Sequence, residues 1–509
     1  MVLAVVAAGA LYNQYRETVQ ERDRAEAVSE FLTDIFSHSD PQTLNTPETT
    51  ARELLEQAVQ KIEHRPELAP ETKANLLVSL GAAYLNLGLY DQASNLLTTA
   101  VELSREHAPG SEVLGDSLQA LGVLKLQAGD PEQAEQLLSE AIDLRRKILE
   151  PTSEKLASSL NGLGLLHKRN GNYDKAERSY REAIAIRRDN QEDRLGFARS
   201  LQNLAALMRT LDRYAEAEQL YLEAIDIKVK EVGADHPSTA TSVQNLGLLY
   251  KNQGKYEEAK KQYLRAIEIN RNSLGELSPQ VAMGLDNLGV LLLQIGELDE
   301  AESFLREALR VRQQVLEPTH PDVARSLHNL GALKYTAGDL LEAESLYREA
   351  VEITQGTYGP EHTQTLRYQS SLAVALEMNG ELQEAEQILL SSLHALEAKE
   401  PVERREVANI KEKLATVLAK TDRLDEAENY AREASIEFQT LLGVEHPDVA
   451  DAESVLGGVL LLRGHLSEAE PLLRSSYETL LQTRGSDAAA TVEALKRLQA
   501  LERLQKDGG

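Results

Sequence analysis

The hydrophobic positions of this chain follow the period of an α-helix, in paired segments that a glycine separates. The first segment of one pair places hydrophobic and small residues on one helical spacing, at Val243, Leu246, Gly247 and Tyr250. The second segment continues this spacing at Tyr256, Ala259, Tyr263, Ala266 and Ile267. Side chains at such intervals lie on one side of a helix. The pattern therefore predicts two helices that meet at Gly254, each with one apolar face.

The helix pair recurs with a period of 42 residues. Short segments with Pro at the second position and Ala at the fifth begin at residues 236, 278, 320 and 446, which lie 42, 42 and 126 residues apart. In phase with them, ten leucines are each followed by Gly or Ala: Leu80, Leu121, Leu163, Leu204, Leu246, Leu288, Leu330, Leu372, Leu414 and Leu456. Neither helix of a pair can bury its apolar face alone, so the pairs must stack. The sequence thus predicts an all-α solenoid of ten helix pairs.

Helix ends are marked by proline and glycine. Pro237 and its equivalents fit the first turn of the first helix, which tolerates a missing N–H. Gly254 and its equivalents end that helix, and Asp212 and Asp422 replace the glycine in two copies. Gly247 and Ala259 are small where the two backbones are expected to approach, since a larger side chain would overpack the contact.

These residues resemble the tetratricopeptide repeat family, whose pattern is Leu-Gly, Tyr, Gly-x-Tyr, Ala, Tyr, Ala. The 42-residue period, with Gly-x-x-x-His-Pro at residues 233–237 and 443–447, is similar to the kinesin-light-chain variety. The resemblance covers about residues 70–483. It implies a right-handed superhelical solenoid that binds a protein or peptide.

The predicted organisation has four regions. Residues 1–12 are an apolar helix end or part of a transmembrane helix, and residues 13–50 are a charged helix and linker. Residues 51–483 form the solenoid, which opens with a lone second-type helix, and residues 484–509 form a capping helix and tail.

The apolar run from Val2 to Leu11 is about half the length of the roughly 20 residues that a membrane-spanning helix needs. It is either the end of a span that starts upstream of Met1 or a helix end that packs locally. We favour the first interpretation and expect membrane association through the N-terminus. The charged residues that follow show no basic excess, which favours an extracytoplasmic solenoid, with a cytoplasmic one as the alternative.

The N-terminal order of segments is similar to the juxtamembrane segment of bacterial receptor-like serine/threonine kinases with repeat-containing C-terminal halves. It consists of an apolar end, a charged stretch, residues 25–32 and Ser39-Asp40-Pro41. The resemblance implies a signalling role beside a kinase. The chain itself has no glycine-rich phosphate loop, no His-Arg-Asp and no Asp-Phe-Gly, so no kinase chemistry can be assigned to it.

Charge and composition narrow the function further. The net charge is −28, from 54 basic and 82 acidic residues, which disfavours nucleic acid as a partner. The chain has no cysteine, and its loop histidines His236, His320 and His446 lack a second ligand at metal-binding spacing. The carboxylates fall mainly on exposed helix faces. We therefore expect no cofactor, no metal and no enzymatic activity.

Four asparagines are the leading candidates for partner binding. Asn203, Asn245, Asn287 and Asn329 each precede the signature leucine, 42 residues apart. Asn is disfavoured inside helices because its side chain competes for backbone hydrogen bonds. Since an amide both donates and accepts, a row of them can bind the backbone of an extended peptide. A structural hydrogen bond between repeats is the alternative.

Basic residues gather on the same face. Three positions of each first helix, equivalent to Thr241, Asn245 and Asn252, include six basic residues, Arg169, Arg199, Arg325, Arg367, Lys413 and Lys420, against the acidic Asp116 and Asp451. This reverses the charge balance of the whole chain and favours an acidic or carboxylate-bearing peptide. The predicted peptide-binding residues are Asn203, Asn245, Asn287, Asn329, Asn252, Arg199, Arg325, Arg367 and Lys413. The predicted function is a scaffold or sensor that holds an extended segment of another protein, with architectural self-association as the alternative.

Overall fold

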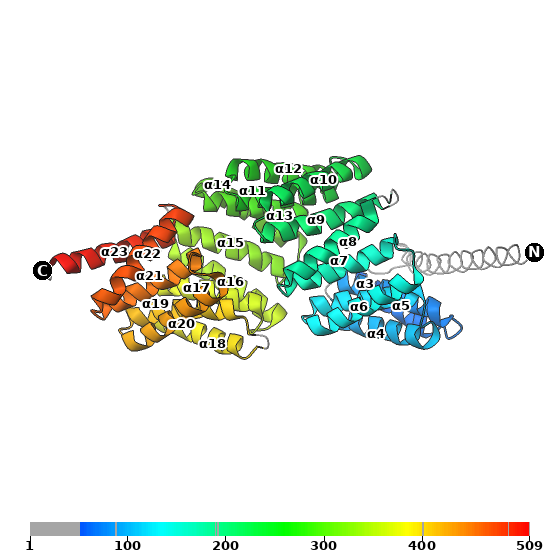
Figure 1. Ribbon diagram of the computed structural model, residues 1–509, viewed down its shortest axis with the longest axis horizontal. Helices are drawn as coiled ribbons and strands as arrows, with labels where there is room; N and C mark the ends of the chain where they lie inside the picture. Colours follow the sequence, from blue (N-terminus) through cyan, green and yellow to red (C-terminus); the bar gives the residue numbers. More distant parts are fainter. Residues whose placement is uncertain are drawn as a thin grey trace, which may run out of the picture. The chain divides into compact units, whose positions relative to one another are not determined.

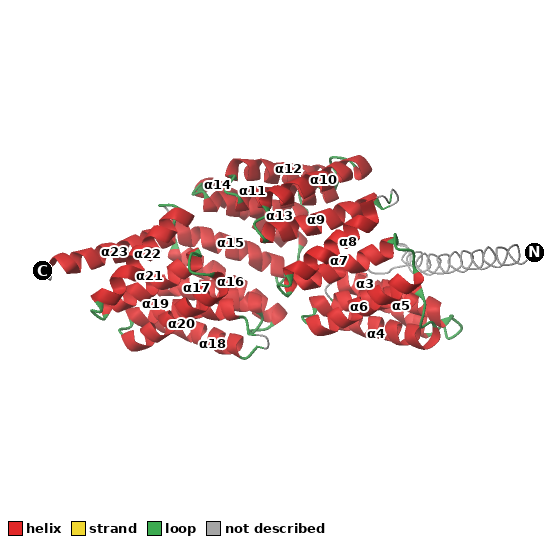
Figure 2. Ribbon diagram, viewed as in Figure 1, coloured by secondary structure: helices red, strands yellow, loops and turns green. Residues whose placement is uncertain are grey.

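The computed structural model describes residues 51–86, 89–188, 190, 193–399, 402–486 and 488–507, and the regular structure of these residues is entirely helical (Figure 2). The predicted regions 1–12 and 13–50 lie outside the described residues. Among the helices that are described, none is long and apolar enough to cross a membrane. The chain divides into two compact units, Met1–Gly254 and Lys255–Gly509.

The first unit is a succession of helix pairs that begins with a single helix (Figure 1). Its described helices are α2 (Ala51–Glu63), α3 (Pro70–Asn86), α4 (Tyr90–His107), α5 (Glu112–Gln127), α6 (Pro131–Ile148), α7 (Glu154–Arg169), α8 (Tyr173–Arg188), α9 (Arg194–Thr210), α10 (Tyr214–Val232) and α11 (Pro237–Asn252). From α3 to α10 the first and second helices of each repeat pack along their length, and each second helix also contacts the next first helix.

The second unit repeats this arrangement and ends with a single helix. Its described helices are α12 (Tyr256–Leu274), α13 (Pro279–Gln294), α14 (Leu298–Val315), α15 (Pro321–Ala337), α16 (Leu340–Tyr358), α17 (Thr363–Asn379), α18 (Leu382–Glu397), α19 (Arg404–Lys420), α20 (Leu424–Leu442), α21 (Pro447–Leu462), α22 (Leu466–Arg484) and α23 (Ala489–Asp507). Helix α23 packs on α21 and α22. Within each unit, the predicted all-α architecture of stacked helix pairs is confirmed.

The first helices start and stop as predicted. Pro237, Pro279, Pro321 and Pro447 each begin a first helix. The loop histidines have a structural role, because Nδ1 of His320 and of His446 accepts the backbone N–H two residues later, at 3.1 Å in both cases. At the other end, Gly338 has φ +84°, and the aspartates at the equivalent site, Asp212 and Asp422, have φ +56° and +62°.

Glycine in the first helix makes room for a large side chain of the second. A Cβ on Gly289 would lie 2.6 Å from the Leu305 side chain and 3.3 Å from the Ala301 carbonyl oxygen. Leu305 occupies the repeat position of Tyr263, and Ala301 that of Ala259. The small residue is needed as predicted, but its closest neighbour is the bulky position of the second helix and not the alanine.

Buried cations tie consecutive repeats together, which the sequence analysis did not predict. Arg145, Arg187, Lys228 and Arg312 occupy one position of the second helices and are all buried. Arg187, on α8, donates from Nη1 to Ser200 Oγ on α9 at 3.0 Å. Arg312, on α14, bonds through Nη1 to Asp286 on α13 and to Ser326 on α15. Each of these two arginines therefore links its repeat to the first helix of the next one.

Candidate functional site

A groove runs across the second unit along its first helices. It encloses about 780 Å³ and is lined by α15, α17, α19, α21 and α23. The residues that line it are Tyr335, Glu377, Met378, Thr416, Ala419, Lys420, Val455, Gly458, Val459, Leu461, Leu462, Ala489, Val492, Glu493, Lys496, Arg497 and Ala500. We call it the first-helix groove. Helix α23 begins 42 residues after α21, so it stands where an eleventh first helix would.

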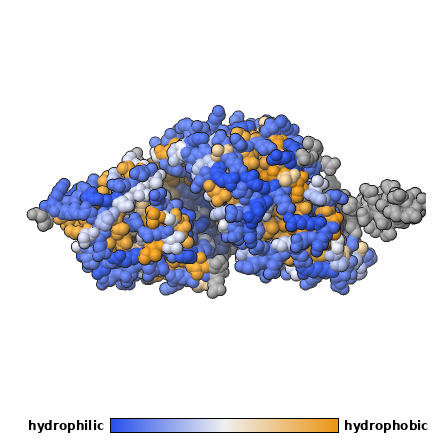
Figure 3. Space-filling view, viewed as in Figure 1, coloured by the Kyte–Doolittle hydropathy of each residue, from blue (hydrophilic) through white to orange (hydrophobic). Residues whose placement is uncertain are grey.

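The floor of the first-helix groove includes exposed apolar side chains. Met378 is 49% exposed and Leu462 is 63% exposed. Both occupy the repeat position of Asn252, as does Lys420 between them. Positions equivalent to Asn252 therefore line a groove in this unit, but none of the nine predicted binding residues is among the residues that line it. Most of the described surface visible in Figure 3 is hydrophilic, with apolar residues in smaller groups.

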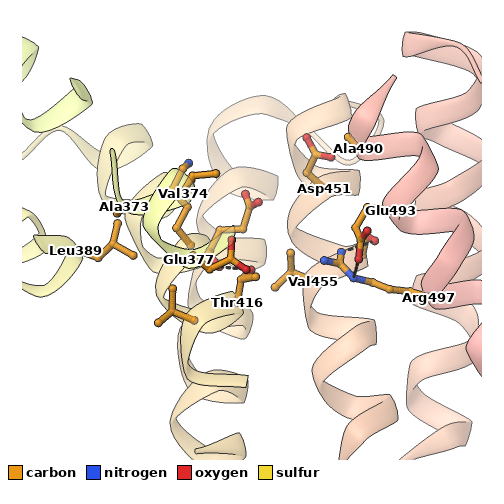
Figure 4. Close-up of a pocket in the computed structure, with 14 residues that line it drawn as sticks. Ala373, Val374, Glu377, Leu389, Thr416, Asp451, Val455, Ala490, Glu493 and Arg497 are labelled. Carbon is orange, nitrogen blue, oxygen red and sulfur yellow. Dashed lines mark hydrogen bonds and ion pairs between the residues drawn. The ribbon is translucent and has the colours of Figure 1, made fainter. Parts of the chain in front are cut away.

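A smaller cavity of about 270 Å³ adjoins the groove and shares with it the lining residues Glu377, Thr416, Val455, Glu493 and Arg497. Four carboxylates line it, from Glu377, Glu412, Asp451 and Glu493, together with Lys413 and Arg497. Figure 4 shows how Glu377, Asp451 and Glu493 come from separate helices around this space. We call it the Glu412 cavity.

Three of the four carboxylates have a cationic partner. Glu377 forms an ion pair with Lys420. Asp451 lies 2.6 Å from Arg484 Nη1. Glu493 lies 3.8 Å from Arg497 Nε, an interaction drawn in Figure 4.

Glu412 is different, because among the described residues its carboxylate has neither a hydrogen bond nor an ion pair. Burial raises the pKa of Glu412 to about 7, against the opposing charges of Lys413 and Arg497 and with a contribution from Asp451 and Asp448. Burial also lowers the pKa of the Arg497 guanidinium, which donates from Nη1 to Ser454 Oγ at 2.9 Å. The cavity therefore holds one carboxyl group to which no described residue is hydrogen-bonded or ion-paired.

The predicted asparagines are placed on first helices but not in one unit. Asn203 and Asn245 belong to the first unit, on α9 and α11, and Asn287 and Asn329 belong to the second, on α13 and α15. All four are half-buried. In the described part of the chain, the side-chain amides of Asn203, Asn245 and Asn287 have no hydrogen-bond partner within the protein.

The fifth predicted asparagine is already engaged. The Asn252 amide, in the orientation that satisfies its neighbours, donates to the Leu248 carbonyl at 3.2 Å and accepts from Arg209 Nη1 at 3.0 Å. Arg209 lies on α9, the preceding first helix. Asn252 thus makes the kind of bond between repeats that was the alternative for the other four.

The predicted basic residues are only partly available to a ligand. Arg325 lies 3.1 Å from Asp322, and Arg367 lies 2.6 Å from Glu406. Lys413 donates to Asn409 Oδ1 at 3.2 Å and lines the Glu412 cavity. Arg199 is exposed on α9.

Four residues of the groove and the cavity were not among the binding residues predicted from the sequence, namely Glu377, Glu412, Glu493 and Arg497. A signal was present for Glu412, which lies two residues before the signature Leu414, where Asp286 and His328 stand in earlier repeats. Across the described residues, no group of three His, Asp or Glu side chains could hold a metal ion.

Comparison with solved structures finds chains similar to about half of this one. BtubC (BKLC) from P. vanneervenii is 27% identical, with a TM-score of 0.40, over 45% of this chain and 92% of its own. A Podosopora anserina kinesin light chain with nearly identical TPR-like repeats is 25% identical, with a TM-score of 0.34, over 44% of this chain and 96% of its own. PilF of Pseudomonas aeruginosa is 20% identical, with a TM-score of 0.33, over 50% of this chain and 97% of its own.

Comparison with curated protein sequences finds no match. The resemblance to receptor-like kinases stays a prediction. A family model described as tetratricopeptide repeat matches residues 72–147, 122–189, 196–272, 280–355, 322–398 and 406–482, and a second model of the same description matches residues 245–314. The chain belongs to the tetratricopeptide repeat family.

Proposed function

We propose that this chain is a protein-interaction module that holds an extended segment of another protein in the first-helix groove. Tetratricopeptide repeats generally mediate interactions between proteins. The observation that carries the proposal is the groove of about 780 Å³ itself, with the exposed apolar side chains of Met378 and Leu462. Lys420, Lys496 and Glu493 add charged groups around them. An apolar floor with a polar rim is the composition expected of a binding site for a protein segment.

The free amides extend this proposal along the first helices. In the second unit, Asn287 on α13 has a side-chain donor and acceptor that no group of the described protein uses. The same holds for Asn203 and Asn245 in the first unit. Such amides suit the backbone of an extended partner, whose N–H and C=O groups alternate along its length.

The charge of the partner cannot be inferred from the number of basic residues on the predicted face. Of the six basic residues on the predicted face, Arg325, Arg367 and Lys420 each pair with a carboxylate of the protein. Their charges are neutralised before any ligand arrives. These residues therefore do not require an acidic partner.

The proposal can be tested by selecting peptides from a random 12-residue library on the full chain. Selected peptides should bind at least tenfold more weakly to a double variant, Met378→Glu with Leu462→Glu, which places two charges in the groove floor. Ile436→Glu is a matched control, because Ile436 is an equally exposed apolar residue, at 62%, on the second helix α20. Peptides that bind the wild type, the groove variant and the control variant equally would show that the groove is not the binding site.

Self-association is the alternative function and has its own readout. If the chain is architectural, its mass in sedimentation should rise with concentration, and no selected peptide should depend on the groove. The membrane tether, the extracytoplasmic location and the signalling role rest on residues 1–50, which lie outside the described residues, and they stay predictions.

A further inference from the structure

Two repeats of the second unit carry a carboxyl group two residues before the signature leucine. In the satisfied form this carboxyl group has bonding partners within the protein, and in the unsatisfied form no described residue bonds to it. The satisfied form is Asp286 on α13, which bonds to Arg312 of its own second helix. Ser326 Oγ of the next first helix donates to Asp286 Oδ1 at 3.2 Å. The carboxylate is almost fully buried, and these two side chains compensate its charge and its lone pairs.

The unsatisfied form is Glu412 on α19, which stands 126 residues, or three repeats, after Asp286. At the same distance, Phe438 replaces Arg312 and Ala452 replaces Ser326. Phe438 is 1% exposed and packs in an apolar cluster with Ala408, Val449 and Ala452. The repeat has therefore kept the carboxyl group and lost both of its internal partners.

Other charged groups around Glu412 do not take the place of the lost arginine. The basic side chains that face it are Lys413 from α19 and Arg497 from α23, and the acidic ones are Glu377 from α17, Asp448 and Asp451 from α21, and Glu493 from α23. Arg497 donates to Ser454, and Lys413 donates to Asn409. Lys420 and Arg484, which do not line the cavity, are paired with Glu377 and Asp451. The side chains that line the cavity itself thus include four carboxylates and two cations, and the cavity shares part of its lining with the first-helix groove.

We propose that the Glu412 cavity receives a lysine or arginine side chain from the bound partner, which supplies to Glu412 the cation that Arg312 supplies to Asp286. This inference rests on the proposed function, because the partner's backbone lies in the adjoining first-helix groove. Met378 and Leu462 in that groove call for apolar residues beside the basic one. The partner segment is therefore recognised by a single cation flanked by apolar side chains, not by acidic residues.

Peptide selection tests the charge of the partner directly. Among library peptides that depend on the groove, a lysine or arginine should be enriched at one position on the wild-type chain, and this enrichment should disappear on Glu412→Gln. Glu478→Gln is the control, since it removes the same charge from an exposed site on α22. Groove-dependent peptides without an enriched basic residue would overturn this inference and leave the proposed function intact. If no selected peptide depends on the groove, both fail.

A pH titration of one selected peptide tests the contact with Glu412. Because the pKa of Glu412 is about 7 and a bound cation favours its ionised form, the affinity should rise about tenfold between pH 6 and pH 8. Citrulline in place of arginine keeps the shape and removes the charge, so this peptide should lose the rise, as should Glu412→Gln with the original peptide. An arginine peptide and a citrulline peptide with the same affinity at pH 8 would overturn the inference.

Discussion

Asp286 and Glu412 occupy the same position of two repeats, and they differ in everything that surrounds their carboxyl groups. Asp286 has a buried arginine and a serine as partners, whereas the repeat of Glu412 has Phe438 and Ala452 at the positions of these two partners. The repeat fixes where a side chain points. Its neighbours on the second helix and on the next first helix decide whether the group holds the structure together or remains open to a partner.

His328 shows a third outcome at this position. It follows Asp286 by 42 residues, and its ring stacks on Tyr368 with centroids 4.3 Å apart. Its Nε2 lies 3.0 Å from Ser371 Oγ on the next first helix. Tyr368 stands where Ser326 does one repeat earlier, so an aromatic contact occupies the place of the hydrogen bond between Ser326 and Asp286.

The largest loss of stability should come from removing Arg312, the cation that pairs with Asp286 in the satisfied form. Arg312→Ala would leave the Asp286 carboxylate buried without its cation, at a cost of about 3 to 5 kcal/mol in the free energy of unfolding. Urea unfolding, together with hydrogen exchange in α13 to α15, would measure it. Arg325→Ala is the control, because Arg325 lies 3.7 Å from the same Asp286 but is 43% exposed. Its loss should cost no more than about 1 kcal/mol. Equal losses of stability in Arg312→Ala and Arg325→Ala would show that the buried arginine contributes no more than the exposed one.

The unsatisfied form should respond in the opposite direction. The raised pKa of Glu412, about 7, means that folding favours the protonated acid, so stability is present below pH 4.5 and is lost as the pH rises through 7. Glu412→Gln, which cannot ionise, should therefore be more stable than the wild type at pH 8 by about 1 to 3 kcal/mol, with the lower value allowing for solvent in the cavity. Urea midpoints at pH 5 and pH 8 would show the gain, which should shrink at pH 5. A variant that is less stable at pH 8 would mean that the carboxylate has an internal partner.

His328 should show the reverse dependence on pH. Burial lowers its pKa to about 4, so the neutral ring is favoured in the folded chain, and stability is lost as the pH falls from 6.5 towards 4. This loss should amount to about 1 to 3 kcal/mol. His328→Gln should remove this part of the pH profile in thermal unfolding. An unchanged profile between pH 6.5 and pH 4 would argue against the buried neutral ring.

The smallest change in stability should come from the free amides. Asn287→Ala should shift the free energy of unfolding by only a few tenths of a kcal/mol, and upwards, because Ala is the better helix former. Binding of a groove-dependent peptide should weaken by about 1 to 3 kcal/mol if the amide bonds to its backbone. Asn252→Ala provides the contrast, since it loses a bond to Arg209 and should reduce stability without affecting that peptide. A lower melting temperature for Asn287→Ala with unchanged binding would identify this amide as structural.

The fold could be predicted because it depends on patterns that every repeat shares. The leucine at Leu246 and its equivalents, the glycine or aspartate at helix ends and the 42-residue period all act locally or between neighbours. The candidate site depended on departures from the pattern. The period places Phe438 at the position of Arg312, but nothing in it shows that Arg312 pairs with Asp286, or that the charge of Arg367 is cancelled by Glu406 one repeat later. Such pairings become visible only when helices from different repeats are placed side by side.

The buried arginines also bear on how such an array can be cut and recombined. Arg187 on α8 reaches Ser200 on α9, and Arg312 on α14 reaches Ser326 on α15, so each of these contacts joins the second helix of one repeat to the first helix of the next. A module excised as a first helix followed by its own second helix would keep the bond between Arg312 and Asp286 but sever the bond to Ser326. A module that starts at a second helix and ends with the following first helix would keep the bond to Ser326 but sever the bond to Asp286. For grafting or shortening these repeats, the smallest unit that keeps both bonds is therefore one repeat together with the next first helix.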